Sequence, residues 1–233
     1  EGSGYVRYLD LWENNLVGTI PAEIANLTGL YRLWLYGNAL TGPIPPEIGN
    51  MASLEYLGLY RNQLTGTIPF NLFNLTNLVG FFLAANNLTG NVPAEIGGLT
   101  NLVQIDLGGN SLSGPIPPQL GNLLNLTSLY IADNNFTGTI PDELANLVNL
   151  EYLRLENNEL TGSLPTWLGD YSHLKDLGIS GTQISGEIPI EIGNISTLEN
   201  LWIDHNQLTG SIPVSLGNLD NVRDMVLSGN QLS

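Results

Sequence analysis

The sequence predicts an α/β solenoid, built from ten stacked copies of one 24-residue unit. An apolar residue recurs every 24 positions without an insertion, and further apolar residues follow it after three and five positions. An Asn stands eight positions after nearly every one of these anchors. Nine of the 13 Pro and nine of the 27 Gly form single columns, Pro21 to Pro213 and Gly18 to Gly210. We therefore expect one domain over residues 1–233, with units starting at 6, 30, 54, 78, 102, 126, 150, 174, 198 and 222.

Each unit begins with a predicted β-strand, written LxxLxL. Apolar and variable residues alternate in this stretch, which is typical of a strand with one buried face. Stacking the units places the strands side by side, so Leu9, Leu33 and Leu57 are expected in one core row of a parallel sheet. No single unit could bury such a row alone. Bulkier segments occupy the opposite side of each unit, and we therefore expect the strand side to be concave.

The remainder of each unit predicts turns and a helical segment. The Asn column is expected in an interior turn, where the side-chain amides bond backbone groups of their own unit and of the next unit. Thr182 replaces Asn once, and a local water or an altered turn is expected there. The LTGxIP segment has Gly where the chain bends and Pro where no N–H is needed. The PxxLGNL stretch predicts a short helical turn on the outer side.

Composition excludes several functional classes. Six Lys and Arg stand against 22 Asp and Glu, a net charge of -16, which disfavours nucleic acids and anionic membrane surfaces as partners. The absence of Cys excludes disulfides and thiolate zinc sites, and no apolar run is long enough to span a bilayer. No nucleophile elbow, phosphate loop or HExxH motif occurs, and His173 and His205 have no partner at ligand spacing. We expect no enzymatic activity, no cofactor and no metal.

Candidate binding residues occupy the outward positions of the LxxLxL strands, which the core does not dictate. All six basic residues and most large aromatic residues fall there. Aromatic residues together with Arg are typical of interface hot spots. The predicted ligand-binding residues are Tyr8, Trp12, Arg32, Trp34, Tyr36, Tyr56, Tyr60, Arg61, Phe82, Tyr130, Tyr152, Arg154, Trp202 and Asp204.

This predicted surface changes along the stack. Trp12, Tyr36 and Tyr60 share a column in consecutive units, which places them roughly 5 Å apart by strand spacing. The middle units carry small residues such as Ala84 and Gly108, so a ligand backbone could approach closely there. Beyond them the surface becomes mixed and acidic. A protein or peptide is the favoured ligand, and a glycan is the alternative because stacked aromatic rings beside carboxylates also suit a sugar chain.

The unit over residues 54–77, LEYLGLYRNQLTGTIPFNLFNLTN, resembles the plant-type leucine-rich repeat of receptor-kinase ectodomains and polygalacturonase-inhibiting proteins. The resemblance covers residues 6–233, and the LTGxIP element is specific to this subclass. It implies a right-handed solenoid with a second short strand at LTGxIP, and extracellular or cell-surface recognition of proteins, peptides or glycans. Plant members usually carry Cys-paired caps, which this chain lacks, so we expect it to be part of a longer protein.

The favoured function is a non-catalytic receptor or adhesin ectodomain fragment that binds a protein or peptide on its concave face. The alternatives are a secreted inhibitor of a cell-wall hydrolase, a glycan binder and a structural spacer in a surface protein. Thr columns such as Thr65–Thr67 and Thr137–Thr139 add an ice-binding protein to these alternatives.

Six N-x-S/T sequences are candidate glycosylation sites. The repeat itself writes NLT at recurring positions, so they are compatible with secretion without establishing it. They are Asn26, Asn74, Asn87, Asn125, Asn135 and Asn194.

Overall fold

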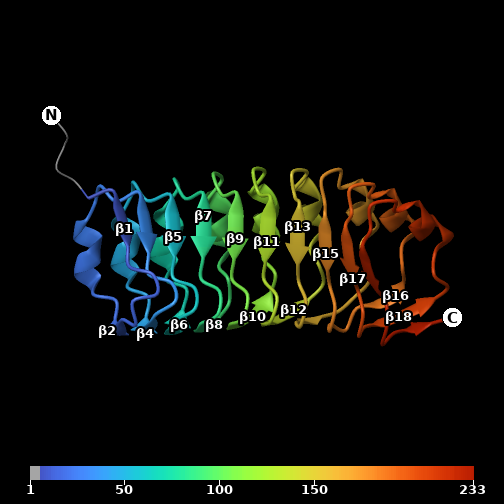
Figure 1. Ribbon diagram of the computed structural model, residues 1–233, viewed down its shortest axis with the longest axis horizontal. Helices are drawn as coiled ribbons and strands as arrows, with labels where there is room; N and C mark the ends of the chain where they lie inside the picture. The colour runs from blue at the N-terminus through green and yellow to red at the C-terminus, as the bar shows by residue number, and fades with distance from the viewer. Residues whose placement is uncertain (1–5) are drawn as a thin grey trace.

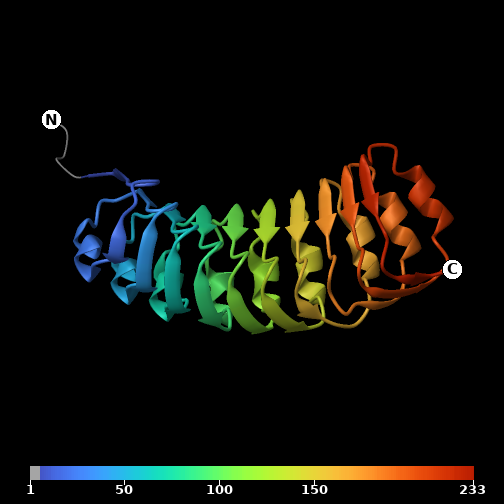
Figure 2. The same ribbon diagram turned by 60° about the horizontal axis from the view of Figure 1, so that its bottom comes forward.

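The computed structural model describes residues 6–233, which form a curved solenoid of stacked units (Figures 1 and 2). Each complete unit contributes a strand to a first sheet, a strand to a second sheet and one 3-10 helix, in that chain order. The predicted fold class and the ten-unit architecture are confirmed. Among the described residues, no helix is long and apolar enough to cross a membrane.

The first sheet, called the concave sheet below, is parallel and has ten strands, one per unit. Its register repeats without a shift, so that Leu9 lies opposite Leu33, Leu33 opposite Leu57 and Leu57 opposite Phe81. This is the core row expected from the sequence, and Leu33, Leu57 and Phe81 are fully buried. The strands are β1 (Tyr8–Asp10), β3 (Arg32–Trp34), β5 (Tyr56–Gly58), β7 (Gly80–Phe82), β9 (Gln104–Asp106), β11 (Ser128–Tyr130), β13 (Tyr152–Arg154), β15 (Asp176–Gly178), β17 (Asn200–Trp202) and β19 (Asp224–Val226).

The second sheet is formed by the LTGxIP segments along another side of the coil (Figure 1). It is divided into a seven-stranded part, from β2 to β14, and a three-stranded part, from β16 to β20. The strands are β2 (Val17–Thr19), β4 (Ala39–Pro43), β6 (Gln63–Thr67), β8 (Asn87–Gly90), β10 (Ser111–Pro115), β12 (Asn135–Gly138), β14 (Glu159–Leu160), β16 (Ser185–Glu187), β18 (Gln207–Gly210) and β20 (Gln231–Leu232).

The outer helical turns are 3-10 helices of five residues each. A Pro in extended conformation precedes each helix, and its carbonyl accepts an i to i+3 bond, as from Ile24 N to Pro21 O at 3.1 Å. Five residues are too few to build a stable α-helix, and the tighter 3-10 form is the usual solution for a connector of this length. The helices are η1 (Ala22–Asn26), η2 (Pro46–Asn50), η3 (Phe70–Asn74), η4 (Ala94–Gly98), η5 (Pro118–Asn122), η6 (Asp142–Asn146), η7 (Thr166–Asp170), η8 (Ile190–Asn194) and η9 (Val214–Asn218).

The Asn column forms a hydrogen-bonded ladder between units. Asn62 is 8% exposed, and its side-chain nitrogen donates to Leu59 O of its own unit at 2.9 Å and to Leu35 O at 3.0 Å. Its side-chain oxygen accepts from Leu40 N at 3.1 Å. Leu35 and Leu40 belong to the preceding unit, so the prediction of bonds to the next unit was wrong in direction. The side chain lies inside the coil above the turn of the unit before it, where carbonyl and N–H groups are free to pair.

Thr182 interrupts this ladder and coincides with the division of the second sheet. Its hydroxyl bonds the side-chain oxygen of Asn206, and no bond from it reaches Leu155 or Leu160 of the preceding unit. In the neighbouring unit, Asn158 accepts the corresponding bond from Phe136 N at 2.9 Å. Strand β14 stops at Leu160, and an isolated bridge between Ser163 and Ser185 joins the two parts. Two backbone hydrogen bonds, from Gln183 N to Leu160 O and from Ser185 N to Gly162 O, also connect them. The altered turn expected at Thr182 is therefore a shortened strand pairing.

Candidate functional site

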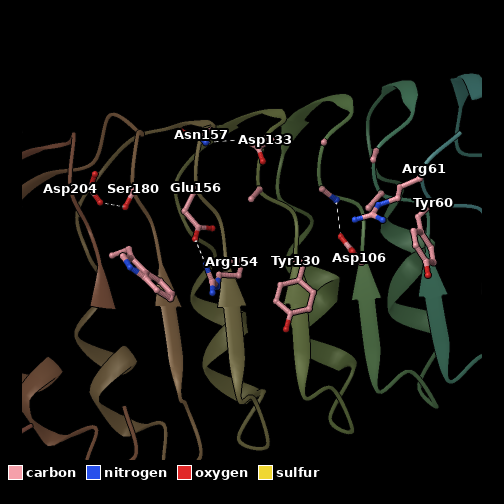
Figure 3. Close-up of a pocket in the computed structure, with 16 residues that line it drawn as sticks. Tyr60, Arg61, Asp106, Tyr130, Asp133, Arg154, Glu156, Asn157, Ser180 and Asp204 are labelled. Carbon is pink, nitrogen blue, oxygen red and sulfur yellow. Dashed lines mark hydrogen bonds and ion pairs between the residues drawn. The ribbon is translucent and has the colours of Figure 1, made fainter. Parts of the chain in front are cut away.

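The outward face of the concave sheet carries a long groove with a volume of about 890 Å³ (Figure 3). Its floor is low because the middle units present only small residues at these positions, as the sequence predicts. The floor consists of Ala84, Ala85, Gly108, Gly109 and Ala132. Polar and aromatic side chains from Tyr60 to Asp204 form its walls, so one ligand lying in it would contact seven consecutive units.

A smaller pocket of about 250 Å³ joins the groove at its N-terminal end. Both cavities share Tyr60 and Asp106 as wall residues. Four aromatic side chains and one carboxylate line the smaller pocket, which we call the aromatic pocket. Its residues are Trp34, Tyr36, Tyr60, Phe82 and Asp106.

Two glycines allow the aromatic side chains to lie low over the sheet. A Cβ at Gly58 would meet Cδ1 of Trp34 at 2.9 Å, and one at Gly80 would meet Cε2 of Phe82 at 2.6 Å. Both glycines are buried. Gly80 is also covered by Tyr56, whose Cδ1 would lie 2.9 Å from a Cβ there, so this small residue does not belong to the low floor.

A ladder of stacked rings runs from the first unit to this pocket. The ring centroids of Trp12 and Tyr36 are 5.6 Å apart, and those of Tyr36 and Tyr60 are 4.2 Å apart, with interplanar angles of 7° and 10°. The stacking follows from the unshifted register, which repeats the same outward position in every unit. Burial raises the pKa of Tyr60 to about 12, so its phenol is neutral at physiological pH.

Arg32 is held on its own aromatic and acidic neighbours beside this ladder. Its guanidinium carbon lies 4.3 Å from the centroid of Trp34 and 4.8 Å from that of Tyr8. Its Nη2 is 2.6 Å from Oδ2 of Asp10, and its Nε donates to Oδ1 at 3.0 Å. The bidentate ion pair neutralises this cation within the protein.

Arg154 is held in the same manner at the C-terminal side of the groove. Its guanidinium carbon lies 4.1 Å from the centroid of Trp202, above Gly178 in the intervening unit. Its two terminal nitrogens donate to Glu156 at 3.0 Å and to Asp176 at 2.9 Å. Burial acts to lower the pKa of Arg154, but these two hydrogen bonds outweigh it and the net shift is upward. Arg154 remains charged and already paired.

Asp106 and Arg61 are charged residues of the groove without an ion-pair partner among residues 6–233. Oδ1 of Asp106 accepts a hydrogen bond from Gly108 N at 3.1 Å, and burial raises its pKa although this bond opposes the shift. Arg61 is exposed at the rim and adopts a positive φ of 54°. Figure 3 shows Tyr60 and Asp106 on the same stretch of the groove wall.

Asp204 closes the far end of the groove and is internally satisfied. It accepts from the Ser180 hydroxyl, and its Oδ2 lies 2.6 Å from Nδ1 of His205. Burial acts to raise the pKa of Asp204, but the hydrogen bonds from Ser180 and His205 outweigh it and lower the pKa.

The structure divides the predicted ligand-binding residues into three groups. Trp34, Tyr36, Tyr60 and Phe82 line the aromatic pocket, and Tyr60, Arg61, Tyr130, Arg154, Trp202 and Asp204 line the groove. Tyr8, Trp12, Arg32, Tyr56 and Tyr152 lie on the same sheet face but line neither cavity. The predicted ligand-binding residues do not include the polar lining residues Asp106, Asp133, Glu156, Asn157 and Ser180. The repeat could have identified them. Asp106 aligns with Phe82 and Tyr130 in the concave sheet. By the 24-residue period, Glu156 and Ser180 share the position of Tyr60, and Asp133 and Asn157 share that of Arg61.

The remaining predicted features lie elsewhere. All six candidate glycosylation residues are exposed: Asn26, Asn74, Asn87, Asn125, Asn135 and Asn194. The Asn125 side chain donates to Thr100 O at 3.0 Å, which engages the nitrogen that a glycan would use. Across residues 6–233, no three His, Asp or Glu side chains form a group that could hold a metal ion.

Sequence comparison matches the chain to profiles described as leucine-rich repeat. One covers residues 124–184, and another covers 5–27, 29–51, 53–75, 101–123 and 197–219. A search of curated protein sequences finds no match.

Several solved structures are similar to this chain. A plant peptide hormone receptor, RGFR1 in complex with RGF2, is 39% identical over 95% of this chain and 36% of its own, with a TM-score of 0.92. The PEPR1–AtPEP1 complex is 38% identical over 97% of this chain and 32% of its own, with a TM-score of 0.91. A plant ice-binding protein is 30% identical over 97% of this chain and 72% of its own, with a TM-score of 0.82. The chain therefore spans about a third of the two receptors.

Proposed function

The chain belongs to the plant-type leucine-rich-repeat family, and from this premise we propose that it is an extracellular, non-catalytic module that binds a peptide along its concave sheet. The observation that carries the proposal is the groove of about 890 Å³. Its low floor admits an extended backbone, and its walls supply the aromatic and charged groups that anchor side chains. A plant peptide hormone receptor of the same fold, 39% identical, is seen in complex with RGF2, and the 33% identical receptor kinase HAESA is seen with an IDA peptide hormone ligand.

The direction of the groove suits an extended ligand. It crosses the strands from Tyr60 to Asp204, so a peptide in it would lie across the sheet and not pair with a strand edge. Affinity would then come from side chains entering the aromatic pocket and contacting Tyr130 and Trp202. We favour peptide binding over a hydrolase inhibitor or a structural spacer. A spacer in particular needs no hollow surface lined by aromatic side chains.

Panning a displayed library of random decapeptides on the folded chain tests the proposal. We expect selected peptides to lose about 10-fold or more of their affinity with Tyr60→Ala or Trp34→Ala, measured by calorimetry, because buried aromatic anchors dominate interface energy. Val214→Ala is the matched control, since Val214 is 96% exposed outside the groove. Binding that survives both groove substitutions but depends on Val214 would contradict the assignment.

The second sheet supports a second candidate, ice binding. Thr19 lies opposite Thr41, and Thr67 opposite Thr89, in adjacent strands of the second sheet, all four exposed, with about 4.8 Å between paired strands. The similarity to a plant ice-binding protein, 30% identical to this chain, also supports this candidate. A thermal-hysteresis assay decides it. Activity that disappears with Thr67→Tyr, and persists with Tyr60→Ala, would assign ice binding to the second sheet.

A further inference from the structure

The aromatic pocket has a chemistry of its own, defined by four electron-rich rings and one carboxylate. We propose that it is a receptor site for the basic side chain, arginine or lysine, of a bound peptide. This inference rests on the proposed peptide-binding function and names the ligand group that one part of the groove selects. A volume of about 250 Å³ is below the ~300–1,000 Å³ of sites for whole small molecules, so it suits a single side chain.

The protein itself holds two cations in sites of the same composition. Arg32 lies over Trp34 and Tyr8 and pairs with Asp10. Arg154 lies over Trp202 and pairs with Glu156 and Asp176. In both sites, ring faces attract the guanidinium and a carboxylate fixes its orientation. The aromatic pocket repeats these components, with Asp106 as the carboxylate, but no cation of residues 6–233 pairs with Asp106.

The state of Asp106 favours a cation over a neutral group. One hydrogen bond, from Gly108 N to Oδ1, is its only one among the described residues. A partly buried carboxylate with so little compensation is stabilised by an incoming positive charge. Burial is the main cause of the upward pKa shift of Asp106. The shift therefore has the same origin, a carboxylate that is partly removed from water and has few hydrogen bonds. The net charge of -16 also attracts a basic ligand to this protein.

Two basic residues lie near the pocket, and they make the proposal specific. Arg32 is neutralised by Asp10, at 2.6 Å, and adds little repulsion. Arg61 follows Tyr60 at the rim and has no ion pair within residues 6–233. If the pocket binds a cation, the positive charge of Arg61 opposes binding. If it bound a ligand carboxylate, Arg61 would be needed to pair with that carboxylate. Arg61→Gln therefore separates the two charges of ligand.

The probes are Nα-acetyl-arginine amide and its neutral analogue of the same shape, Nα-acetyl-citrulline amide. Binding is followed by NMR through the indole N–H signal of Trp34. We expect the arginine probe to bind about 10-fold tighter than the citrulline probe, because only a cation gains from the rings and from Asp106. Asp106→Asn should remove most of this difference, and Phe82→Leu should weaken the arginine probe several-fold. Arg61→Gln should leave its affinity unchanged or tighten it.

Asp133→Asn is the matched control, because Asp133 is an exposed carboxylate of the groove that does not line the aromatic pocket. Equal affinity for the two probes, or a folded Asp106→Asn variant with unchanged selectivity, overturns the proposal. So does a loss of arginine binding with Arg61→Gln. Unchanged circular dichroism of each variant excludes unfolding as the cause.

The outcomes also separate this inference from the proposed function. Library peptides that bind the groove without enrichment of Lys or Arg, together with equal binding of the two probes, reject the cation site and leave peptide binding intact. Selective binding of the arginine probe without any selected peptide rejects the peptide-receptor function and leaves the pocket assignment standing.

Discussion

Units two to four and units seven to nine share one backbone plan, but their concave faces are completed differently. In each region a Gly separates two large residues of the same outward column, Gly58 between Trp34 and Phe82, and Gly178 between Arg154 and Trp202. The space over Gly58 is covered by the Trp34 ring, and the aromatic pocket lies beside it, between Trp34 and Phe82. The space over Gly178 is occupied by the protein's own guanidinium and the Glu156 carboxylate.

The comparison teaches that a neighbouring side chain covers the glycine in both regions, and that the kind of side chain decides whether a cavity remains beside it. Arg154 and Glu156 are long enough to bridge the gap and gain an ion pair by doing so, with Nη1 and Oε1 3.0 Å apart. The Trp34 ring covers Gly58, but it is flat and rigid, so space remains beside it among the other aromatic rings. The same regions differ in the Asn ladder, which is intact through Asn62 and interrupted at Thr182.

The largest expected effect comes from transferring the interruption into the N-terminal region. Asn62→Thr would remove the bonds to Leu35 O and Leu40 N, and would leave buried backbone groups without partners. We expect a loss of about 3 kcal/mol in the free energy of unfolding, measured with urea, since each buried unsatisfied group costs about 1–3 kcal/mol. Gln63→Ala, at an exposed neighbouring position, is the control. A loss below 1 kcal/mol would mean that the ladder contributes little.

The second prediction compares the two glycine gaps directly. A Cβ at Gly178 would overlap the Glu156 carboxylate and displace it from Arg154. Gly178→Ala should therefore destabilise the protein by about 2 kcal/mol, the usual scale of overpacking. Gly58→Ala should cost less than about 1 kcal/mol, because Trp34 is only half-buried and can rotate away. Equal losses in urea unfolding would show that the C-terminal gap is no more tightly filled than the N-terminal one.

A smaller effect is expected when the ladder is repaired. Thr182→Asn can supply the missing bonds to Leu155 O and Leu160 N. One unit earlier, Asn158 makes the equivalent bonds to Ile131 O and Phe136 N. We expect a gain of about 1 kcal/mol in thermal or urea unfolding, limited by the rearrangement of β14 and β16. Slower amide exchange at Leu160 would accompany it. An unchanged exchange rate at Leu160 would contradict a role for Thr182 in dividing the second sheet.

The smallest effect is a pH dependence at the boundary between the two regions. Burial raises the pKa of Asp106 above its unfolded value of about 3.9, so its ionised form destabilises the folded state at neutral pH. This penalty disappears as the pH falls through the folded pKa and then the unfolded pKa. Asp106→Asn should therefore raise the urea midpoint at pH 7, with a difference that vanishes near about pH 3. Asp133→Asn serves as the control. A difference that grows toward acid would have the wrong sign.

Much of the fold follows from the sequence because the 24-residue period has no insertion. In the concave sheet each residue therefore lies beside its equivalent in the next unit, whereas the second sheet pairs residues two positions out of step. The columns of Leu, Asn, Gly and Pro indicate which positions are core, turn or bend. The stacking of Trp12, Tyr36 and Tyr60 was predictable for the same reason. So was the low floor at Ala84 and Gly108.

The candidate site was predictable only in part. The columns place Asp106 beside Phe82, but they do not state whether a cation lies within reach of its carboxylate. Whether Arg154 turns toward Trp202 depends on the competing energies of ion pairs and ring contacts across units. Neither is a local property of the chain.

By itself, the sequence determined the repeat, its register, the two sheets and the face on which aromatic and basic residues gather. Those features depend on local propensity and on a period that every unit repeats. Only the tertiary structure decided the direction of the Asn bonds, the division of the second sheet at Thr182, and which side chain covers each glycine gap. These depend on how far each side chain reaches into the adjacent unit, and that reach is set by packing in three dimensions.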